Sequence, residues 1–132
     1  MTFGLGKHER LCAGRLIDAL HTEGQRLNVY PMAVRWMVCP DETFSTPAQV
    51  MFVAPKRKLH HATDRNRAKR LMRECYRLRK PELYRFLTAN NIKIALSLSY
   101  MHNQPMSYAT LSGKFDKVMA QLEKSLVPQC TD

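Results

Sequence analysis

The stretch that most constrains this chain is a basic run in its middle, which opens on Arg65-Asn66-Arg67. Alanine, leucine, methionine, lysine and arginine favour helices, and neither Gly nor Pro interrupts the run before Pro81. Asp64 is expected to cap this helix at its start. Helical spacing predicts an apolar stripe that faces the core, made of Ala68, Leu71, Met72, Cys75 and Leu78. It predicts a neighbouring basic stripe of residues four apart, made of Arg65, Lys69, Arg73 and Arg77.

The positive charge of the chain is concentrated in the same run. Residues 56–80 hold 11 basic and 2 acidic side chains, whereas all 132 residues hold 21 basic and 11 acidic ones. The run therefore carries +9 of the net charge of +10. Stacked like charges repel each other on a solvated helix, so an uncompensated stripe indicates a polyanionic partner such as a nucleic acid.

The remaining periodicity predicts a small α+β fold in a single domain spanning residues 1–132, with residues 1–8 and 127–132 as loose ends. Apolar residues at helical spacing predict a first helix over 9–23 and a last helix that follows Ser107 as its cap. Alternation predicts strands over 30–38, 49–54 and 92–100, and a short strand or loop over 56–61. The basic helix is expected to stop at Pro81, before a short helical piece over 82–87.

The sequence shows no constellation of residues suited to catalysis or metal binding. Phosphate-loop and His-Glu-x-x-His motifs are absent, and no acidic pair is spaced to hold two metal ions. The four cysteines form no Cys-x-x-Cys motif, so free thiols in a reducing compartment are expected. No apolar run approaches the length of a membrane span, and the N-terminus lacks the apolar block of a signal peptide, so a cytoplasmic protein is expected.

The basic run also resembles the signature of a known family. Arg65-Asn66-Arg67, followed by Lys69-Arg70 and Arg73-Glu74, is similar to the "RNR" signature of the protein subunit of bacterial ribonuclease P. Pro55-Lys56-Arg57-Lys58 resembles the lysine-rich segment before that signature, and Lys7-x-x-Arg10-Leu11 resembles the opening of the family. The resemblance runs without gaps over 7–24 and 50–77 and covers most of the chain.

This resemblance implies both a fold and a function. The fold is a single-domain α-β-β-β-α-β-α sandwich, ribonuclease P protein-like, in the class of ribosomal protein S5 domain 2. The function is that of the accessory subunit of a ribonucleoprotein endoribonuclease, a hydrolase of tRNA processing. The protein binds the catalytic RNA and the 5′ leader of precursor tRNA, and assists Mg²⁺-dependent removal of that leader. The RNA subunit carries the active site and, with the substrate, holds most of the Mg²⁺, and neither a membrane nor an obligate protein partner is implied.

Two groups of site residues follow from the resemblance. The first is an RNA-binding group that consists of Arg65, Asn66, Arg67, Lys69, Arg70, Arg73, Lys56, Arg57 and Lys58. Its five cations from Arg65 to Arg73 are expected to contact RNA phosphates through guanidinium forks and a lysine charge, and the cations from Lys56 to Lys58 to extend the positive surface. Within it, Asn66 either donates to a ribose or base edge or caps a turn.

The second group is a leader-binding cleft on the first helix. The family often places two phenylalanines one helical turn apart there, and this chain has Ile17 and His21 at those positions. Tyr30 or Trp36 from the first strand is expected to supply a stacking platform. For Ile17, a place in the core is an equal alternative.

Two other functions fit the same residues. A ribosomal-protein-like module, or a basic helix that reads the DNA major groove, would carry a similar charge. A protein-only nuclease with a dispersed active site is the second alternative. Cleavage of precursor tRNA, tested with and without a bacterial catalytic RNA, distinguishes all three.

Overall fold

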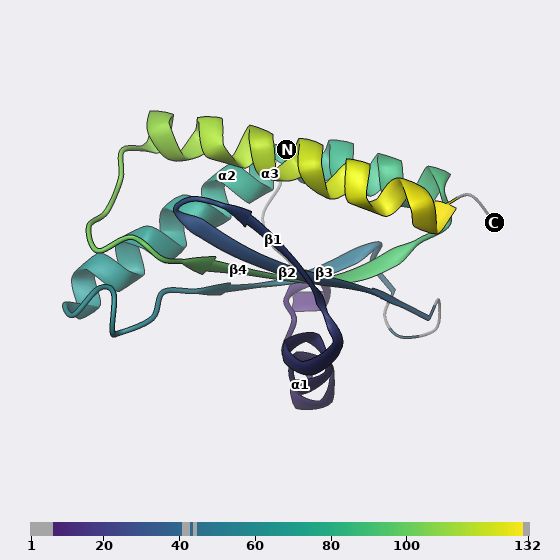
Figure 1. Ribbon diagram of the computed structural model, residues 1–132, viewed down its shortest axis with the longest axis horizontal. Coiled ribbons are helices and arrows are strands. Elements are labelled where there is room, and N and C mark those ends of the chain that lie inside the picture. The colour runs from purple at the N-terminus through teal and green to yellow at the C-terminus, as the bar shows by residue number, and fades with distance from the viewer. Residues whose placement is uncertain (1–6, 41–42, 44, 131–132) are drawn as a thin grey trace.

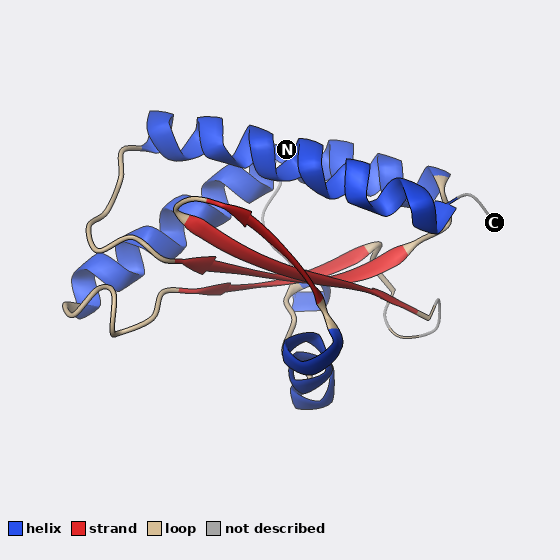
Figure 2. Cartoon of the chain, viewed as in Figure 1, coloured by secondary structure: helices blue, strands red, loops and turns tan. Residues whose placement is uncertain are grey.

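The computed structural model describes residues 7–40, 43 and 45–130. The elements, in chain order, are η1 (Lys7–Glu9), α1 (Gly14–Glu23), β1 (Gln25–Val29), β2 (Met32–Cys39), β3 (Ala48–Val53), α2 (Ala62–Ala89), β4 (Lys93–Tyr100) and α3 (Tyr108–Cys130). Apart from the short 3₁₀ turn η1, this is the order α-β-β-β-α-β-α, and the expected α+β class is confirmed (Figure 2).

The four strands form one twisted sheet in the order β1-β2-β4-β3. Neighbouring strands are antiparallel except β3 and β4, which are parallel and are joined through α2. Helices α2 and α3 cover one face of the sheet, while α1 alone lies against the other (Figure 1). The second face is therefore only partly covered, and the strands leave part of it available as a binding surface.

Alternation along the strands separates two cores of unequal size. On β2, Met32, Val34 and Trp36 are buried toward α2 and α3 in the larger core. The residues between them face α1. The smaller core lies there, and its buried members are Leu11, Leu20, Cys39 and Ala95.

Helix α2 continues past Pro81 to Ala89, so the predicted break at Pro81 is wrong. Proline removes one backbone hydrogen bond from a helix interior. The turns that follow it bury Leu83 and Leu87 in the main core, and this packing outweighs the local preference. The helix also begins at Ala62, with His61 at the N-cap position, so Asp64 lies in the first turn instead of capping it.

The first helix is shorter than expected because the chain before it joins the sheet. The backbone N–H of Leu11 donates to the carbonyl of Val50 at 2.9 Å, and Arg10 forms an isolated parallel bridge with Val50. Helix α1 consequently begins at Gly14. Of residues 9–13, which were expected to belong to it, Glu9 ends η1, and Arg10 and Leu11 bond to the outer edge of β3.

Five further segments differ from the expectation or refine it. Strand β1 was not predicted, and the segment 56–61 is not a strand: residues 56–58 form a turn in which Lys58 N–H donates to Pro55 O. The Ser107 cap is confirmed, since its hydroxyl accepts the N–H of Thr110 at 3.3 Å. Residues 7–8 lie in η1 and residues 127–130 lie in α3, although both segments were expected to be loose.

Candidate nucleic-acid interface

The first three turns of α2 present a polar face that nothing in the described part of the chain covers. Asn66, Arg67, Arg70 and Arg73 are all exposed. At 100° per residue, these four positions span about a third of the helix circumference. No hydrogen bond or ion pair joins their side chains to another described residue, so these three arginines keep their full hydrogen-bonding capacity for a partner.

This exposed face differs from the predicted basic stripe because the buried face of α2 is rotated about the helix axis relative to the predicted apolar stripe. Tyr76 and Lys80 are buried with Ala68, Met72 and Cys75, whereas Leu78 is 49% exposed. The centre of the buried face lies roughly 60° from the one that the apolar residues alone predict. Arg65 and Lys69 therefore lie half-buried at its border.

Arg65 also has a structural role in the loop before the helix. Its Nη1 donates to the backbone carbonyls of Leu59 and His60, each at 2.9 Å. These two hydrogen bonds tie the loop to the start of α2 and use only one of the guanidinium nitrogens of Arg65. The placement is compatible with a phosphate contact, which stays a prediction for this residue.

The later cations of the run are occupied by carboxylates. Arg77 Nε donates to Glu74 Oε2 at 3.0 Å, and this guanidinium holds the pKa of the Glu74 carboxyl below its ordinary value. Arg79 Nε donates to Asp116 of α3 at 2.8 Å. Lys80 is buried and lies 3.0 Å from Glu9. The basic run thus divides into an unpaired first half and a second half that holds the fold together.

The loop before α2 continues the cationic surface. Lys56 and Arg57 are exposed and Lys58 is half-buried. All three lie in the turn that connects the end of β3 to the start of α2. With Arg67, Lys69, Arg70 and Arg73 they make seven cations without a carboxylate partner among the described residues, and we call this set the basic face.

The predicted leader cleft is only half assembled. Ile17 is half-buried and packs in the smaller core beneath α1, while His21 is exposed in the last turn of that helix. Trp36 is 5% exposed and belongs to the main core on the opposite face of the sheet. Trp36 therefore offers no stacking surface, because residues alternate along β2 and its side chain points toward α2 and α3.

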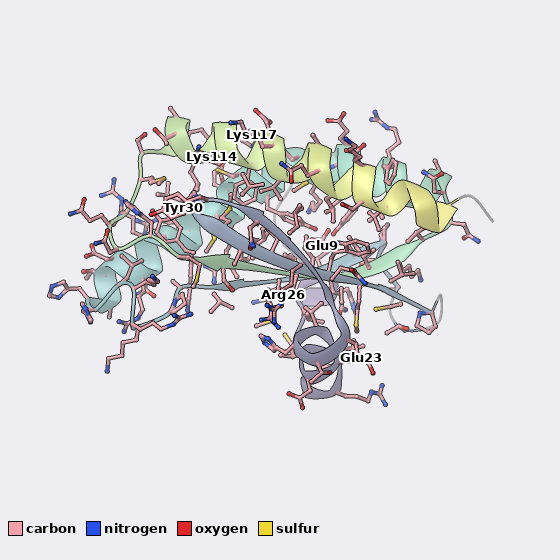
Figure 3. The ribbon with its side chains drawn as sticks, in the orientation of Figure 1. Glu9, Glu23, Arg26, Tyr30, Lys114 and Lys117 are labelled. Atoms are coloured by element: carbon pink, nitrogen blue, oxygen red, sulfur yellow. The ribbon has the colours of Figure 1, made fainter. Side chains whose placement is uncertain are left out.

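Tyr30 is exposed but is also remote from α1. It lies in the turn between β1 and β2, and its ring contacts His102, which in turn contacts the buried Tyr100 of the main core. In Figure 3, Tyr30 lies above the sheet at one end, whereas Arg26 lies below it beside α1. The structure therefore does not bring Tyr30 together with Ile17 and His21.

Sequence reasoning missed two arginines that do lie on the α1 side of the sheet. Arg26 on β1 and Arg35 on β2 are directly opposite each other in the register. Nη1 of Arg35 donates to the backbone carbonyl of His21 at 2.7 Å, and Arg26 is exposed. Polar β1 gave no strong strand signal, so the pairing that brings these arginines to His21 was not visible in the sequence.

A hollow of about 500 Å³ lies where the basic face meets the N-terminal segment. Arg73 from α2 and Arg10 from the bridge to β3 line it, together with Leu11 and Phe52. It opens beside the outer edge of β3, beyond the bridge that Arg10 makes with Val50. The hollow connects the cationic side of α2 to the segment that leads into α1.

Within the described ranges, no three His, Cys, Asp or Glu side chains are grouped so that they hold a metal ion. The donor set of these residues thus does not fit a two-metal phosphodiester site. The described helices include none that is long and apolar enough to cross a membrane.

The fold and the unpaired basic face are those of a small basic α+β protein, and a focused cationic surface of this kind is typical of nucleic-acid-binding proteins. A family model described as Ribonuclease P matches residues 5–123. The ribonuclease P protein component of Porphyromonas gingivalis is 31% identical over 121 residues, covering 92% of this chain and 88% of that protein. That of Chlorobium phaeobacteroides is 40% identical over 82 residues, covering 61% of this chain and 56% of that protein.

Solved structures agree on the fold. The ribonuclease P protein of Staphylococcus aureus superposes with a TM-score of 0.69 at 14% identity, covering 88% of this chain and 96% of that one. The protein from Thermotoga maritima gives a TM-score of 0.51 at 20% identity, covering 92% and 94%. The chain belongs to the ribonuclease P protein family, and membership of that family implies an RNA partner.

Proposed function

We propose that this protein is the accessory subunit of a bacterial ribonuclease P in the cytoplasm, where it assists endonucleolytic removal of the 5′ leader from precursor tRNA. The observation that carries the proposal is the basic face: seven cations on α2 and the loop before it, unpaired among the described residues. Arginine forks and lysine charges are suited to RNA phosphates. The family match to residues 5–123 supports the catalytic RNA of that enzyme as the proposed RNA partner.

The division of the basic run supports this assignment. Arg79 and Lys80 bind carboxylates of α3 and η1 and position α2 against these elements, while Arg77 pairs with Glu74 within α2. The cations from Lys56 to Arg73 stabilise nothing comparable in the fold, apart from the loop contact of Arg65. Their mutual repulsion destabilises the free protein and is relieved when phosphates lie between them.

The chemical step belongs to the RNA in this proposal. In the proposal, Mg²⁺ is held mainly by the catalytic RNA and the substrate, where it takes part in phosphodiester cleavage. The protein contributes binding and orientation: it lowers the repulsion between two RNA molecules and positions the leader.

The leader is proposed to cross the face of the sheet that carries α1. Ile17 and His21 contribute from the helix, while Arg26 and Arg35 contribute from the strands beside it. Relative to the phenylalanine pair frequent in the family, this surface offers less stacking and more positive charge. It is therefore suited to the phosphates of the leader more than to its bases.

Cleavage assays with purified components test the proposal. Precursor tRNA is incubated with the protein, with a bacterial ribonuclease P RNA, or with both, over a range of Mg²⁺ concentrations. We expect the protein alone to be inactive and to improve cleavage by the RNA at low Mg²⁺. Cleavage by the protein alone would identify a protein-only nuclease. Absence of any effect on the RNA, together with tight binding to duplex DNA, would identify a different basic module.

A further inference from the structure

An exposed tyrosine, Tyr30, and its half-buried partner His102 lie at one end of the sheet and are not part of the proposed leader surface. The side chain of Tyr30 is 61% exposed. Its hydroxyl lies 2.5 Å from Nδ1 of His102, and the two rings meet edge to face with centroids 5.6 Å apart. His102 also contacts the ring of Tyr100, which is fully buried. The exposed ring of Tyr30 is thereby held by a chain of contacts that reaches the core.

The backbone around the pair is fixed as well. Met101 N–H donates to the carbonyl of Pro31 at 2.7 Å, which joins the loop after β4 to the turn that carries Tyr30. The hydroxyl of Tyr100 donates to the carbonyl of Gln104 at 2.6 Å and holds the same loop. The Tyr30 ring is therefore held in place by a hydrogen bond at its hydroxyl and by the fixed backbone around it. Such a ring loses little conformational entropy when a nucleic-acid base stacks on its exposed face.

The register places this pair beside the basic face. Val29 is opposite Met32 and Met32 opposite Tyr100, while Val53 of β3 is opposite Ser99. The turn with Tyr30, the loop with His102 and the loop 54–61 therefore leave the sheet at the same end (Figure 1). At about 4.8 Å between neighbouring strands, the ends of β1 and β2 at the Tyr30 turn lie roughly 10 to 15 Å from the end of β3, which leads into the segment with Lys56, Arg57 and Lys58.

This combination has a known physical use. Proteins that bind unpaired RNA place exposed aromatic rings beside cations, so that a base stacks on the ring while neighbouring phosphates meet the cations. A distance of 10 to 15 Å corresponds to about two nucleotides of extended strand. The α1 surface is on the other face of the sheet, so a strand that reaches Tyr30 follows the basic face instead of the leader path.

We infer that Tyr30 and His102 form a stacking platform for an unpaired base of the catalytic RNA, next to the phosphates that the basic face contacts. The inference rests on the proposed function and names the chemistry of its partner: a single-stranded segment adjoining the RNA that binds α2. Tyr30 supplies the ring face, and His102 orients it.

The test compares Tyr30→Ala and Tyr30→Trp with the wild-type protein in titrations of the catalytic RNA without substrate. We expect Tyr30→Ala to weaken binding about 5- to 100-fold, the range that one stacked base contributes. The salt dependence of its affinity should match that of the wild type, because stacking releases no counterions. Tyr30→Trp should restore the affinity, and its fluorescence should be quenched on binding, while the buried Trp36 gives the same background in every variant.

Two comparisons make the result decisive. Arg70→Ala, measured in parallel, reports on the basic face alone. If Arg70→Ala weakens binding and Tyr30→Ala does not, the platform is refuted while the proposed function stands; if neither variant changes binding, the proposed function itself fails. A loss confined to precursor tRNA with a leader, absent for the catalytic RNA alone, would assign Tyr30 to the leader and overturn the inference.

Discussion

Arg26 on β1 and Arg35 on β2 face each other directly across an antiparallel strand pair. Like charges in this relation destabilise a sheet by a few tenths of a kcal/mol to about 1 kcal/mol. Arg35 is oriented by its hydrogen bond to the carbonyl of His21, where a cation also interacts favourably with the C-terminal end of the helix dipole. Arg26 has no such partner among the described residues. We therefore expect this arginine pair to bind a phosphate, while the repulsion between the two arginines lowers the stability of the free protein.

Replacing Arg26 by alanine should separate these two effects. We expect Arg26→Ala to leave the free energy of unfolding unchanged or to raise it by about 0.5 kcal/mol, because the like-charge pair is removed. The same variant should bind precursor tRNA more weakly while binding mature tRNA normally. Urea unfolding and titration of the holoenzyme with both tRNAs measure the two quantities.

His21→Ala and Arg35→Ala complete this comparison. His21→Ala should reproduce the selective loss for leader-bearing tRNA without a change in stability, since its side chain is exposed. Arg35→Ala should also lower stability, because the carbonyl at the end of α1 loses its charged donor. Equal losses for leader-bearing and mature tRNA in all three variants would place the leader elsewhere.

The basic face makes a separate prediction about salt. Each phosphate contact contributes about −0.7 to −0.9 to the slope of log affinity against log salt concentration. Arg67→Ala should therefore weaken binding of the catalytic RNA and flatten this slope by about one contact. Binding titrations between low and moderate salt give the slope directly.

Arg85 provides a matched control for that measurement. It is exposed on the same helix, 18 residues beyond Arg67, which is five full turns and roughly 27 Å along the same side. Arg85→Ala removes the same charge and should leave the slope unchanged. A slope that falls equally in both variants would mean that the protein responds to net charge and not to contacts on the basic face.

Much of this fold could be predicted from the sequence where periodicity is long and regular. The alternation in β4 and the apolar repeat of α3 correspond to the observed elements within a few residues. Strand β1 and the passage of α2 through Pro81 could not be predicted in this way. Both depend on tertiary contacts: β1 exists through its pairing with β2, and the last turns of α2 through the burial of Leu83 and Leu87.

The pairing of charges in the site also could not be predicted from the sequence. The concentration of cations over residues 56–80 was evident, but not which of them remain unpaired. Asp116 is 37 residues from Arg79, and Glu9 is 71 residues from Lys80. Only the fold brings these carboxylates to α2. The buried face of α2 includes Lys80, which pairs with Glu9, and on this helix Arg67 and Arg70 are exposed whereas Arg65 is half-buried.

The thiol of Cys75 predicts a pH dependence of stability. Burial raises the pKa of Cys75 from 9.0 to about 11. The folded state therefore retains a proton that the unfolded state releases, and the associated stability is complete below about pH 8.5 and declines as the pH rises toward 11. Compared with Cys75→Ala, the wild type should lose more unfolding free energy between pH 7.5 and pH 10.5.

Urea unfolding of both proteins at the two pH values checks this difference. Buried tyrosines whose pKa is also raised act in the same direction, but they are present in both proteins and cancel. Cys12→Ala, which removes an exposed thiol, should follow the wild type. An identical pH dependence for wild type and Cys75→Ala would show that the Cys75 thiol does not titrate with unfolding.

Two neighbouring tyrosines of α2 should respond oppositely to removal of their hydroxyls. Tyr84 donates to Glu9 Oε1 at 3.1 Å, beside the ion pair with Lys80. The hydroxyl of Tyr76 is buried and makes no hydrogen bond of ordinary geometry with any described residue. Burial raises the pKa of both hydroxyls, so both stay protonated near neutral pH. The fold thus gains from one of them and is penalised by the other.

Tyr84→Phe is expected to lower the free energy of unfolding by about 1.5 kcal/mol, because a hydrogen bond to a charged group is lost. Tyr76→Phe keeps the ring contact with Phe52, whose centroid lies 5.7 Å away, and removes only the unsatisfied hydroxyl. It should leave stability unchanged or raise it by up to about 1 kcal/mol. Urea unfolding at pH 7 compares the two variants, which differ only in the position of one deleted oxygen. If Tyr76→Phe destabilises the protein as much as Tyr84→Phe, the Tyr76 hydroxyl has a partner, and the cluster around Glu9 extends to it.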